Sequence, residues 1–197
     1  SEEAVENGLT TIRNLIANWD PHPTFFEVVT ALALRHFSNV NVDVAILETG
    51  LGGRLDATNA VQSDVSVITP VDFDHENWLG NTLAEIAAEK AGIIKRGVPV
   101  VSAPQQSRAE EVICARAAEC GAPLRFVTEP YHRSPVVLRG ENQKQHAAVA
   151  IAAIDTANLH VYEKALVRGL AATEWPVPFP SRNGLLILVR SHHLAAP

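Results

Sequence analysis

Short apolar runs alternate with amphipathic stretches along this chain, and no other feature limits its fold so strongly. Four such runs span residues 42–47, 65–69, 98–101 and 124–127. Each has the length of a strand, and nearly continuous apolar runs are typical of parallel strands that are buried on both faces. Helical patterns at about 82–95 and 108–120 separate the later runs. The sequence therefore predicts an α/β fold, with a mostly parallel sheet and helices on both of its faces.

The remaining stretches predict the domain organisation. We expect helices at about 4–17 and 24–37 before the first strand, and at about 141–157 and 161–173 after the last one. Pro176, Pro178 and Pro180 then indicate a stiff linker. Residues 185–189 form a lone apolar run, whose partner strands we expect to be missing from this chain. We therefore predict one domain over residues 1–175, followed by a linker and a single strand over residues 176–197.

Charge and hydropathy argue against several classes of protein. The 16 Lys and Arg residues stand against 22 Asp and Glu residues, which gives a net charge of −6. Without a long basic run, this balance argues against a nucleic-acid partner or an anionic membrane surface. No apolar run approaches the roughly 18 residues that a membrane-spanning helix needs, and the first residues are acidic, unlike a signal peptide. We expect a cytoplasmic protein.

Two of the predicted strands end in side chains that can bind a metal ion. Glu48 follows the first strand, and Asp72, Asp74 and His75 follow the second. Ligands of open parallel sheets bind beyond the carboxyl ends of the strands, and the tips of neighbouring strands lie about 5 Å apart. If these strands are neighbours, Glu48 and His75 can share one divalent ion with substrate phosphates. In the structural alternative, His75 caps its loop and Glu48 meets a backbone amide.

Lys90 lies on the apolar side of a predicted helix. Helical periodicity groups it with Leu83 and Ile86, whereas Glu89 points to the polar side. A buried ammonium is unfavourable unless it finds a partner or loses its proton, and a neutral lysine amine is nucleophilic. Such an amine can take up carbon dioxide as a carbamate, which is a carboxylate-like metal ligand. In the alternative, Lys90 extends to the helix end or pairs with Glu48.

The glycine cluster at residues 50–53 invites comparison with nucleotide-binding loops. Leu55 occupies the position of the third glycine in the dinucleotide-binding pattern, and residues 54–59 do not begin an amphipathic helix. The phosphate loop that ends in Gly-Lys-Ser/Thr is absent from all 197 residues. We therefore interpret the glycines as positions at which the backbone passes close to a ligand.

Longer motifs resemble a known family. Residues 48–59 read Glu-Thr-Gly-Leu-Gly-Gly-Arg-Leu-Asp-Ala-Thr-Asn, which resembles the E-x-GLGGRLDATN signature of the folylpolyglutamate synthase/dihydrofolate synthase family, within the Mur ligase superfamily. Residues 24–27 resemble its T-x-F-E motif, residues 74–82 its DH…LG-x-T motif, and residues 86–93 its IA-x-EKAGI motif. The resemblance covers about residues 1–175 and implies an incomplete central ATPase-type domain of a Mur ligase.

The resemblance also implies an ATP-dependent amide ligase. In the family, ATP phosphorylates the carboxylate of dihydropteroate or of a folate to an acyl phosphate, which the amino group of L-glutamate then attacks. Mg²⁺ bridges the ATP phosphates. By motif, Glu48 and His75 match magnesium ligands and Lys90 matches the lysine that is carbamylated in the superfamily. The residues that match the pterin pocket, or lie in its loop, are Phe26, Arg54, Asp56 and Ala57.

The chain departs from the family in its nucleotide-contacting motifs. Gln143 and His192 are the expected nucleotide contacts, but most of the H-Q-x-x-N-A and D-G-A-H-N-P motifs around them is lost. The family's phosphate loop lies upstream of Thr24, so we expect the isolated chain to be inactive. Two alternatives stay open. One is a non-catalytic relative that keeps a folate-binding or scaffold role, and the other is a metal-dependent phosphohydrolase built on Glu48, Asp72, Asp74 and His75.

Overall fold

The computed structural model describes residues 1–137, 140, 142–173 and 185–190. Its helices and strands follow one another as α1 (Glu2–Ile16), α2 (Phe25–Asn39), β1 (Val44–Glu48), the 3₁₀ helix η1 (Ala57–Ala60), β2 (Val65–Ile68), α3 (Glu76–Leu79), α4 (Leu83–Ala91), β3 (Val100–Ser102), α5 (Ser107–Cys120), β4 (Leu124–Phe126), α6 (Gln143–Thr156), α7 (Glu163–Ala172) and β5 (Leu185–Arg190). The expected alternation of strands and helices is confirmed.

A single five-stranded sheet forms the centre of the molecule, in the order β1-β5-β2-β3-β4. Strands β2, β3 and β4 pair in parallel, and β5 runs antiparallel to both of its neighbours. Because β1 and β2 are each antiparallel to β5, they run in the same direction as one another. The prediction of an α/β fold with a mostly parallel sheet is therefore confirmed.

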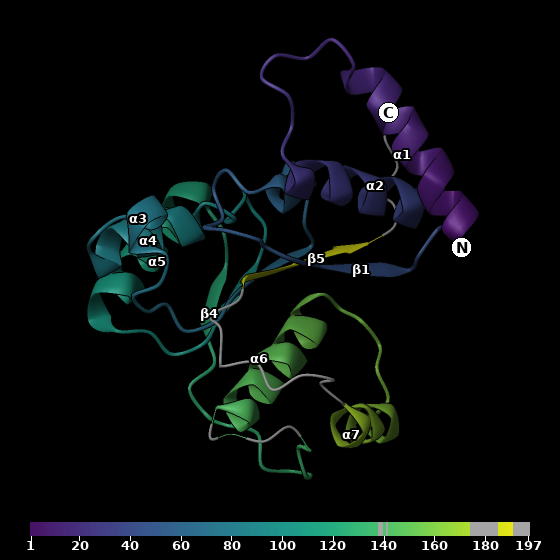
Figure 1. The fold of residues 1–197 in the computed structure, drawn as a ribbon. Coiled ribbons are helices and arrows are strands. Elements are labelled where there is room, and N and C mark those ends of the chain that lie inside the picture. Colours follow the sequence, from purple (N-terminus) through teal and green to yellow (C-terminus); the bar gives the residue numbers. More distant parts are fainter. Residues whose placement is uncertain (138–139, 141, 174–184, 191–197) are drawn as a thin grey trace.

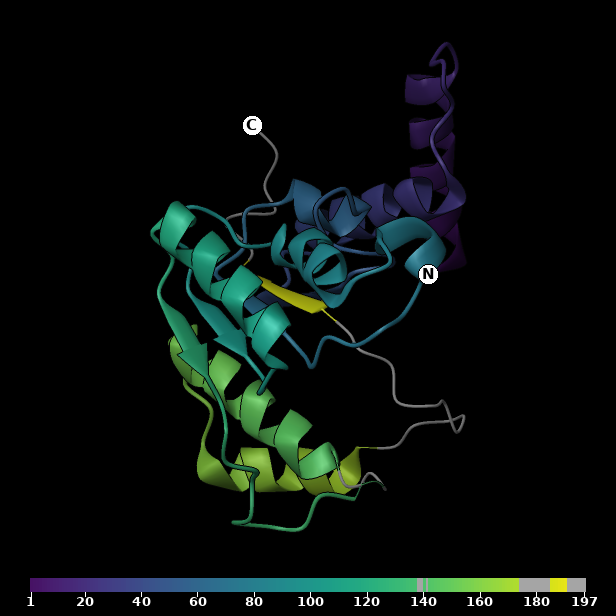
Figure 2. The same cartoon turned by 90° about the vertical axis from the view of Figure 1, so that its left-hand side faces the viewer.

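Helices cover both faces of this sheet (Figure 1). On one face, residues of α2, α4 and α5 pack with Ala45, Leu47 and Ile68 of the strands. On the other face, α6 packs with Val65, Val67 and Val101. Helix α7 lies beyond α6 on that side, and α1 stands at the periphery against α2 (Figure 2). Alternate strand residues thus belong to two separate cores, as the nearly continuous apolar runs require.

The last strand contradicts one expectation. Residues 185–189 were expected to lack partner strands in this chain, but β5 pairs with β1 from Val44 to Glu48 and with β2 from Val65 to Ile68. The physical reason is that β1 and β2 each offer a backbone edge toward the gap between them, and buried edges need hydrogen-bond partners. The division into residues 1–175 and 176–197 stays a prediction.

Local signals fix the helices that carry the candidate site. Thr24 and Thr82 each form a capping box with a glutamate three residues later, at the start of α2 and of α4. Both boxes satisfy backbone N–H groups that a helix leaves unpaired in its first turn. In the part of the chain that the structure describes, none of the helices combines the length and the apolar character needed to cross a membrane.

Candidate functional site

Asp56 organises the loop that follows β1. One oxygen of its carboxylate, Oδ2, accepts hydrogen bonds from the backbone N–H groups of Gly50 (2.8 Å) and Leu51 (3.0 Å). The other, Oδ1, accepts from the N–H group (2.9 Å) and the hydroxyl group (2.5 Å) of Thr58. Four donors on one carboxylate hold the two ends of residues 50–58 together, and we call this segment the glycine loop. Asp56 therefore anchors the loop, whatever else it contacts.

The ring of Phe26 rests on the same loop. A Cβ atom placed on Gly50 would lie only 2.7–3.0 Å from three carbons of this ring, so any side chain at position 50 would displace it. Phe26 nevertheless leaves 41% of its surface exposed. Ala57 follows Asp56 as the first residue of η1. Phe26 and Asp56 thus both contact Gly50, and Ala57 follows Asp56 in the chain. An exposed ring beside hydrogen-bonding groups suits a flat ligand with polar edges.

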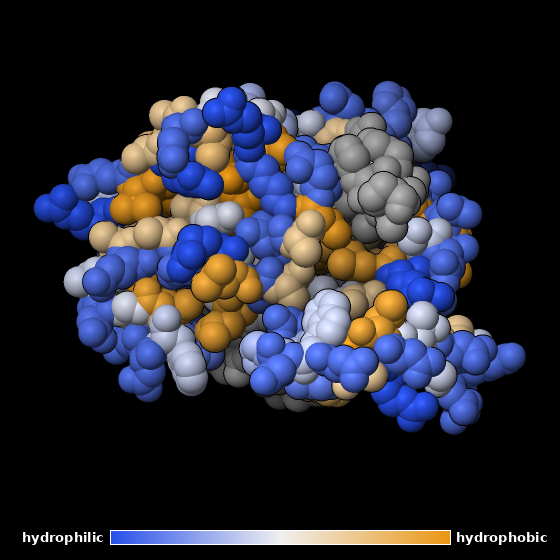
Figure 3. Space-filling view, turned by 90° about the horizontal axis from the view of Figure 1, so that it is seen from above, coloured by the Kyte–Doolittle hydropathy of each residue, from blue (hydrophilic) through white to orange (hydrophobic). Residues whose placement is uncertain are grey.

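Apolar side chains are also exposed on the segments that carry these residues. Phe25, Leu55, Phe73 and Trp78 each leave more than half of their surface open to solvent. Figure 3 shows apolar areas between hydrophilic ones on the face of the molecule seen from above. Apolar surface of this kind on the segments that flank the glycine loop and His75 is consistent with a binding region for an aromatic ligand.

The side chain of Arg54 is engaged by a residue of α4. Its guanidinium pairs with the carboxylate of Glu89 on α4, at 2.9 Å, and its backbone N–H donates to the carbonyl of Glu89. The sequence did not single out Glu89 as a functional residue, and only its place in the EKAGI motif could have done so. The glycines likewise approach protein atoms: the backbone at Gly53 lies against the carbonyl groups of Glu89 and Lys90.

Lys90 is buried in α4, as its helical position predicts. Its exposed fraction is 6%, and the other buried residues of the helix are Leu83, Ile86, Ala87 and Ala91. Burial lowers the pKa of Lys90 from its usual range, and the charge of Asp74 partly opposes this shift. Among the described residues, no hydrogen bond or ion pair reaches the Lys90 ammonium, so the alternative pairing with Glu48 is not formed. A buried amine with a lowered pKa is the state from which a carbamate can form.

Glu48 and His75 are both exposed near the carboxyl ends of strands. His75 adopts the left-handed backbone region (φ 53°, ψ 36°) and lies 3.6 Å from the Asp74 carboxylate. Non-glycine residues in this region often mark functional sites. The alternatives from the sequence are not seen: the His75 side chain makes no capping hydrogen bond, and no described backbone amide donates to the Glu48 carboxylate.

Glu48 ends β1, His75 lies beyond the end of β2 at the start of α3, and these two strands are not neighbours. Glu48 of β1 and Val67 of β2 both pair with Leu186 of β5. Two strand spacings, about 10 Å, therefore separate β1 from β2 at this level of the sheet. The condition for direct sharing of an ion, adjacent strands with tips about 5 Å apart, is therefore wrong. The described residues also contain no group of three or more His, Cys, Asp or Glu side chains placed to hold a metal. A magnesium ion at Glu48 or His75 fits only if phosphate oxygens and water complete its shell.

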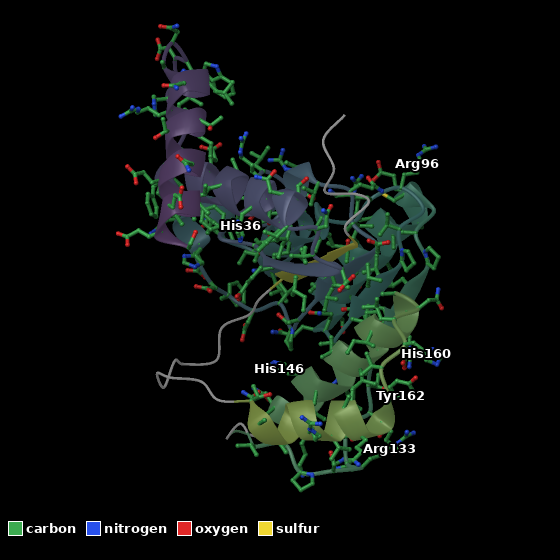
Figure 4. The ribbon with its side chains drawn as sticks, turned by 90° about the vertical axis from the view of Figure 1, so that its right-hand side faces the viewer. His36, Arg96, Arg133, His146, His160 and Tyr162 are labelled. Carbon is green, nitrogen blue, oxygen red and sulfur yellow. The ribbon has the colours of Figure 1, made fainter. Side chains whose placement is uncertain are left out.

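The remaining predicted residues lie apart from this region or outside the structure's described part. Gln143 begins α6, and Figure 4 shows His36 of α2 and His146 of α6 on opposite sides of the sheet. Gln143 and Phe26 therefore come from helices on different faces. His192 lies outside the described residues. Asp72 accepts hydrogen bonds from the N–H of Phe73 and from Gln106, so it does not join a metal-binding cluster.

Comparisons with known proteins agree with these features. No protein-family model matches the chain. A dihydrofolate synthase/folylpolyglutamate synthase from Bacillus subtilis is 39% identical over 198 aligned positions, which cover 86% of this chain and 44% of that protein. The structure of Mycobacterium tuberculosis folylpolyglutamate synthase complexed with ADP and AMPPCP has 30% identity and a TM-score of 0.80, and covers 89% of this chain and 48% of that one.

A third comparison adds a second ligand. A folylpolyglutamate synthase–AMPPCP–folate complex has 32% identity and a TM-score of 0.76, over 86% of this chain and 48% of the other. The chain therefore spans less than half the length of these relatives, in sequence as in structure.

Proposed function

The chain matches part of the folylpolyglutamate synthase/dihydrofolate synthase family in sequence and in fold, and from this premise we propose that it supplies the acid-binding and lysine-bearing part of an ATP-dependent ligase. The ligase joins L-glutamate to dihydropteroate or to a folate. The cytoplasmic location expected from the sequence belongs to the same proposal.

One observation carries this proposal, namely the contact between a surface suited to bind an aromatic ligand and a helix that holds a buried lysine. The first surface is the glycine loop, which contains Asp56, with the ring of Phe26 from α2 resting on it. The second is α4, which carries the buried Lys90 and packs directly against that loop through Gly53. A flat, partly polar heterocycle fits the first surface. The reactive amine of Lys90 on α4 gives the site a chemical group that a simple binding protein does not need.

The proposed reaction has two steps at the substrate carboxylate. The γ-phosphoryl group of ATP passes to this carboxylate to give an acyl phosphate and ADP, and the amino group of L-glutamate then displaces phosphate and forms the amide. Mg²⁺, when bound, neutralises charge on the phosphoryl oxygens. Glu48 and His75 are the side chains that would hold it. Lys90 adds carbon dioxide through its neutral amine, releases a proton, and so presents a carboxylate in place of a cation.

Folate binding to the full 197-residue chain tests the acid-binding part. We expect saturable binding in isothermal titration calorimetry, and the Phe26→Ala variant should bind at least roughly fivefold more weakly, because an aromatic contact contributes about 1 kcal/mol. The matched control is Tyr162→Ala, since Tyr162 precedes α7, apart from the glycine loop, and leaves 77% of its surface exposed. This control should bind as the wild type does.

Two outcomes separate the candidate functions. Equal affinity in Phe26→Ala and wild type would contradict the proposed pocket. Folate binding that becomes stronger in the presence of Mg²⁺ and AMPPCP would favour the ligase over the non-catalytic relative. The phosphohydrolase alternative loses support, because the described residues contain no group of three or more His, Cys, Asp or Glu side chains placed to hold a metal.

A further inference from the structure

The glycine loop and α4 are joined by a contact between two residues that are 35 positions apart in the sequence. The Nε and Nη2 atoms of Arg54 both donate to Oε1 of Glu89, at 3.1 and 2.9 Å. The backbone N–H of Arg54 donates to the backbone carbonyl of the same residue, at 2.9 Å. Side chain and backbone thus bind one partner at once, and we call this contact the Arg54–Glu89 clamp.

Beside the clamp, the backbone of the glycine loop and the backbone of α4 are in close contact. A Cβ atom on Gly53 would lie 2.8 Å from the carbonyl oxygen of Glu89 and 2.9 Å from that of Lys90. A Cβ atom on Gly92 would lie 2.3–2.9 Å from Cβ, Cα and N of Arg54. The amide of Asn59 also donates to the carbonyl groups of Arg54 (3.2 Å) and Gly92 (3.1 Å). The loop therefore has one docking position on α4.

The clamp lies between the two parts of the proposed site. Glu89 directly precedes Lys90, and adjacent residues of a helix point about 100° apart. Glu89 faces the loop, with 28% of its side chain exposed, while Lys90 faces the interior with 6% exposed. On the other side of the clamp, Arg54 is two residues before Asp56, which anchors the loop. The buried face of α4 fixes the rotation of the helix, and the contact at Glu89 fixes the place of the glycine loop relative to that helix and so to Lys90.

We propose that Arg54 and Glu89 are positioning residues that hold Lys90 at a fixed place relative to the loop beneath Phe26. Arg54 acts through Glu89 and not through direct contact with the substrate. A guanidinium suits this role because its planar fork can donate two N–H groups to one carboxylate, which a lysine ammonium cannot do with the same geometry. The inference deepens the proposed function and rests on it for the importance of Lys90.

The test uses four variants of the full chain. Arg54→Lys keeps the charge and removes the fork, Glu89→Gln keeps the shape and removes the charge, and the double variant Arg54→Glu/Glu89→Arg reverses the pair. The matched control is the same reversal at Arg108 and Glu111, an exposed ion pair on α5. The distance from Nη1 of Arg108 to Oε2 of Glu111 is also 2.9 Å. Thermal unfolding of each variant shows that it is folded before the other measurements are made.

Two measurements are made on each folded variant. The first is the rate at which an acylating reagent labels Lys90, read by peptide mass spectrometry and divided by the rate at the exposed Lys164. The second is the affinity for folate. We expect each single variant to raise the relative labelling of Lys90 at least threefold and to weaken folate binding at least threefold. The reversed pair should undo at least half of the rise in Lys90 labelling and at least half of the loss in folate affinity. The α5 control should change neither the labelling nor the affinity.

The results distinguish a positioning role of the Arg54–Glu89 clamp from a direct contact between Arg54 and the substrate. Unchanged Lys90 labelling in Glu89→Gln and Arg54→Lys would overturn the proposal. Folate binding that is weaker in the reversed pair than in Arg54→Lys would also overturn it, because the reversed pair removes the positive charge that a direct substrate contact at position 54 needs. If the wild-type chain binds no folate, the proposed function fails, but the labelling of Lys90 still decides whether the clamp positions it.

Discussion

Replacing Gly53 by alanine tests the docking of the glycine loop on α4. The added methyl group would lie 2.8 Å from the carbonyl oxygen of Glu89 and 2.9 Å from that of Lys90. Ordinary contacts between carbon and a carbonyl oxygen begin near about 3.3 Å, so the loop must move away from the helix by several tenths of an ångström. Both neighbours are backbone atoms of one helix, and neither can rotate aside.

The expected magnitude combines two opposing effects. Overpacking of a close interface destabilises by about 1–3 kcal/mol, and alanine reduces the entropy of the unfolded chain, which returns about 0.4–1 kcal/mol. We therefore expect Gly53→Ala to lower the free energy of unfolding by about 1–2 kcal/mol. For a chain of this size, such a loss corresponds to a fall in Tm of roughly 2–8 °C.

The assay is urea denaturation followed by circular dichroism, with Gly169→Ala as the matched control. Gly169 lies inside α7, and a Cβ atom there meets no other atom within 4 Å. Helix propensity alone then predicts a gain of up to about 1 kcal/mol. The same substitution should thus have opposite signs at the two positions. A Gly53→Ala variant as stable as the wild type would refute the close docking of loop and helix.

Three further predictions concern the residues of the site. Lys90→Met should be more stable than the wild type at neutral pH in thermal unfolding. Because burial lowers the pKa of Lys90 in the folded state, the unfolded wild-type chain binds more protons and the stability of the wild type rises with pH. The stability advantage of Lys90→Met should therefore shrink toward pH 10. A difference in stability that stays constant with pH would contradict this prediction. Asp56→Ala should cost about 2 kcal/mol in urea denaturation, since four donors lose their acceptor, and Asp56→Asn should cost less. Glu48→Ala and His75→Ala should each weaken Mn²⁺ binding in titration calorimetry, and unchanged affinity in both refutes their role.

Periodicity and capping signals were sufficient to predict the parts of the site that depend on one helix. The burial of Lys90 follows from its spacing to Leu83 and Ile86, which a helix of 3.6 residues per turn places on one face. The start of α4 at Thr82 follows from the glutamate three residues later. These features need no knowledge of which elements pack together.

Contacts between distant segments could not be predicted in this way. The pairing of β5 between β1 and β2 depends on which backbone edges remain open after the rest of the sheet forms, and residues 185–189 carry no local signal for that choice. The contact of Arg54 with Glu89 likewise arises only when the loop docks on α4. The anchoring role of Asp56 did have a local signal, since an aspartate two residues before a threonine is typical of side-chain-stabilised turns.

The most direct measurement of the central claim is the ¹³C NMR spectrum of the full chain in ¹³C-bicarbonate at mildly alkaline pH, with Mg²⁺ at saturation. The account predicts a carbamate resonance in the wild type that is absent from Lys90→Met, because only Lys90 combines deep burial in a helix with a lowered pKa and no partner among the described residues. No carbamate resonance in the wild type, or one that persists in Lys90→Met, would contradict the claim that this lysine is the reactive amine of the site.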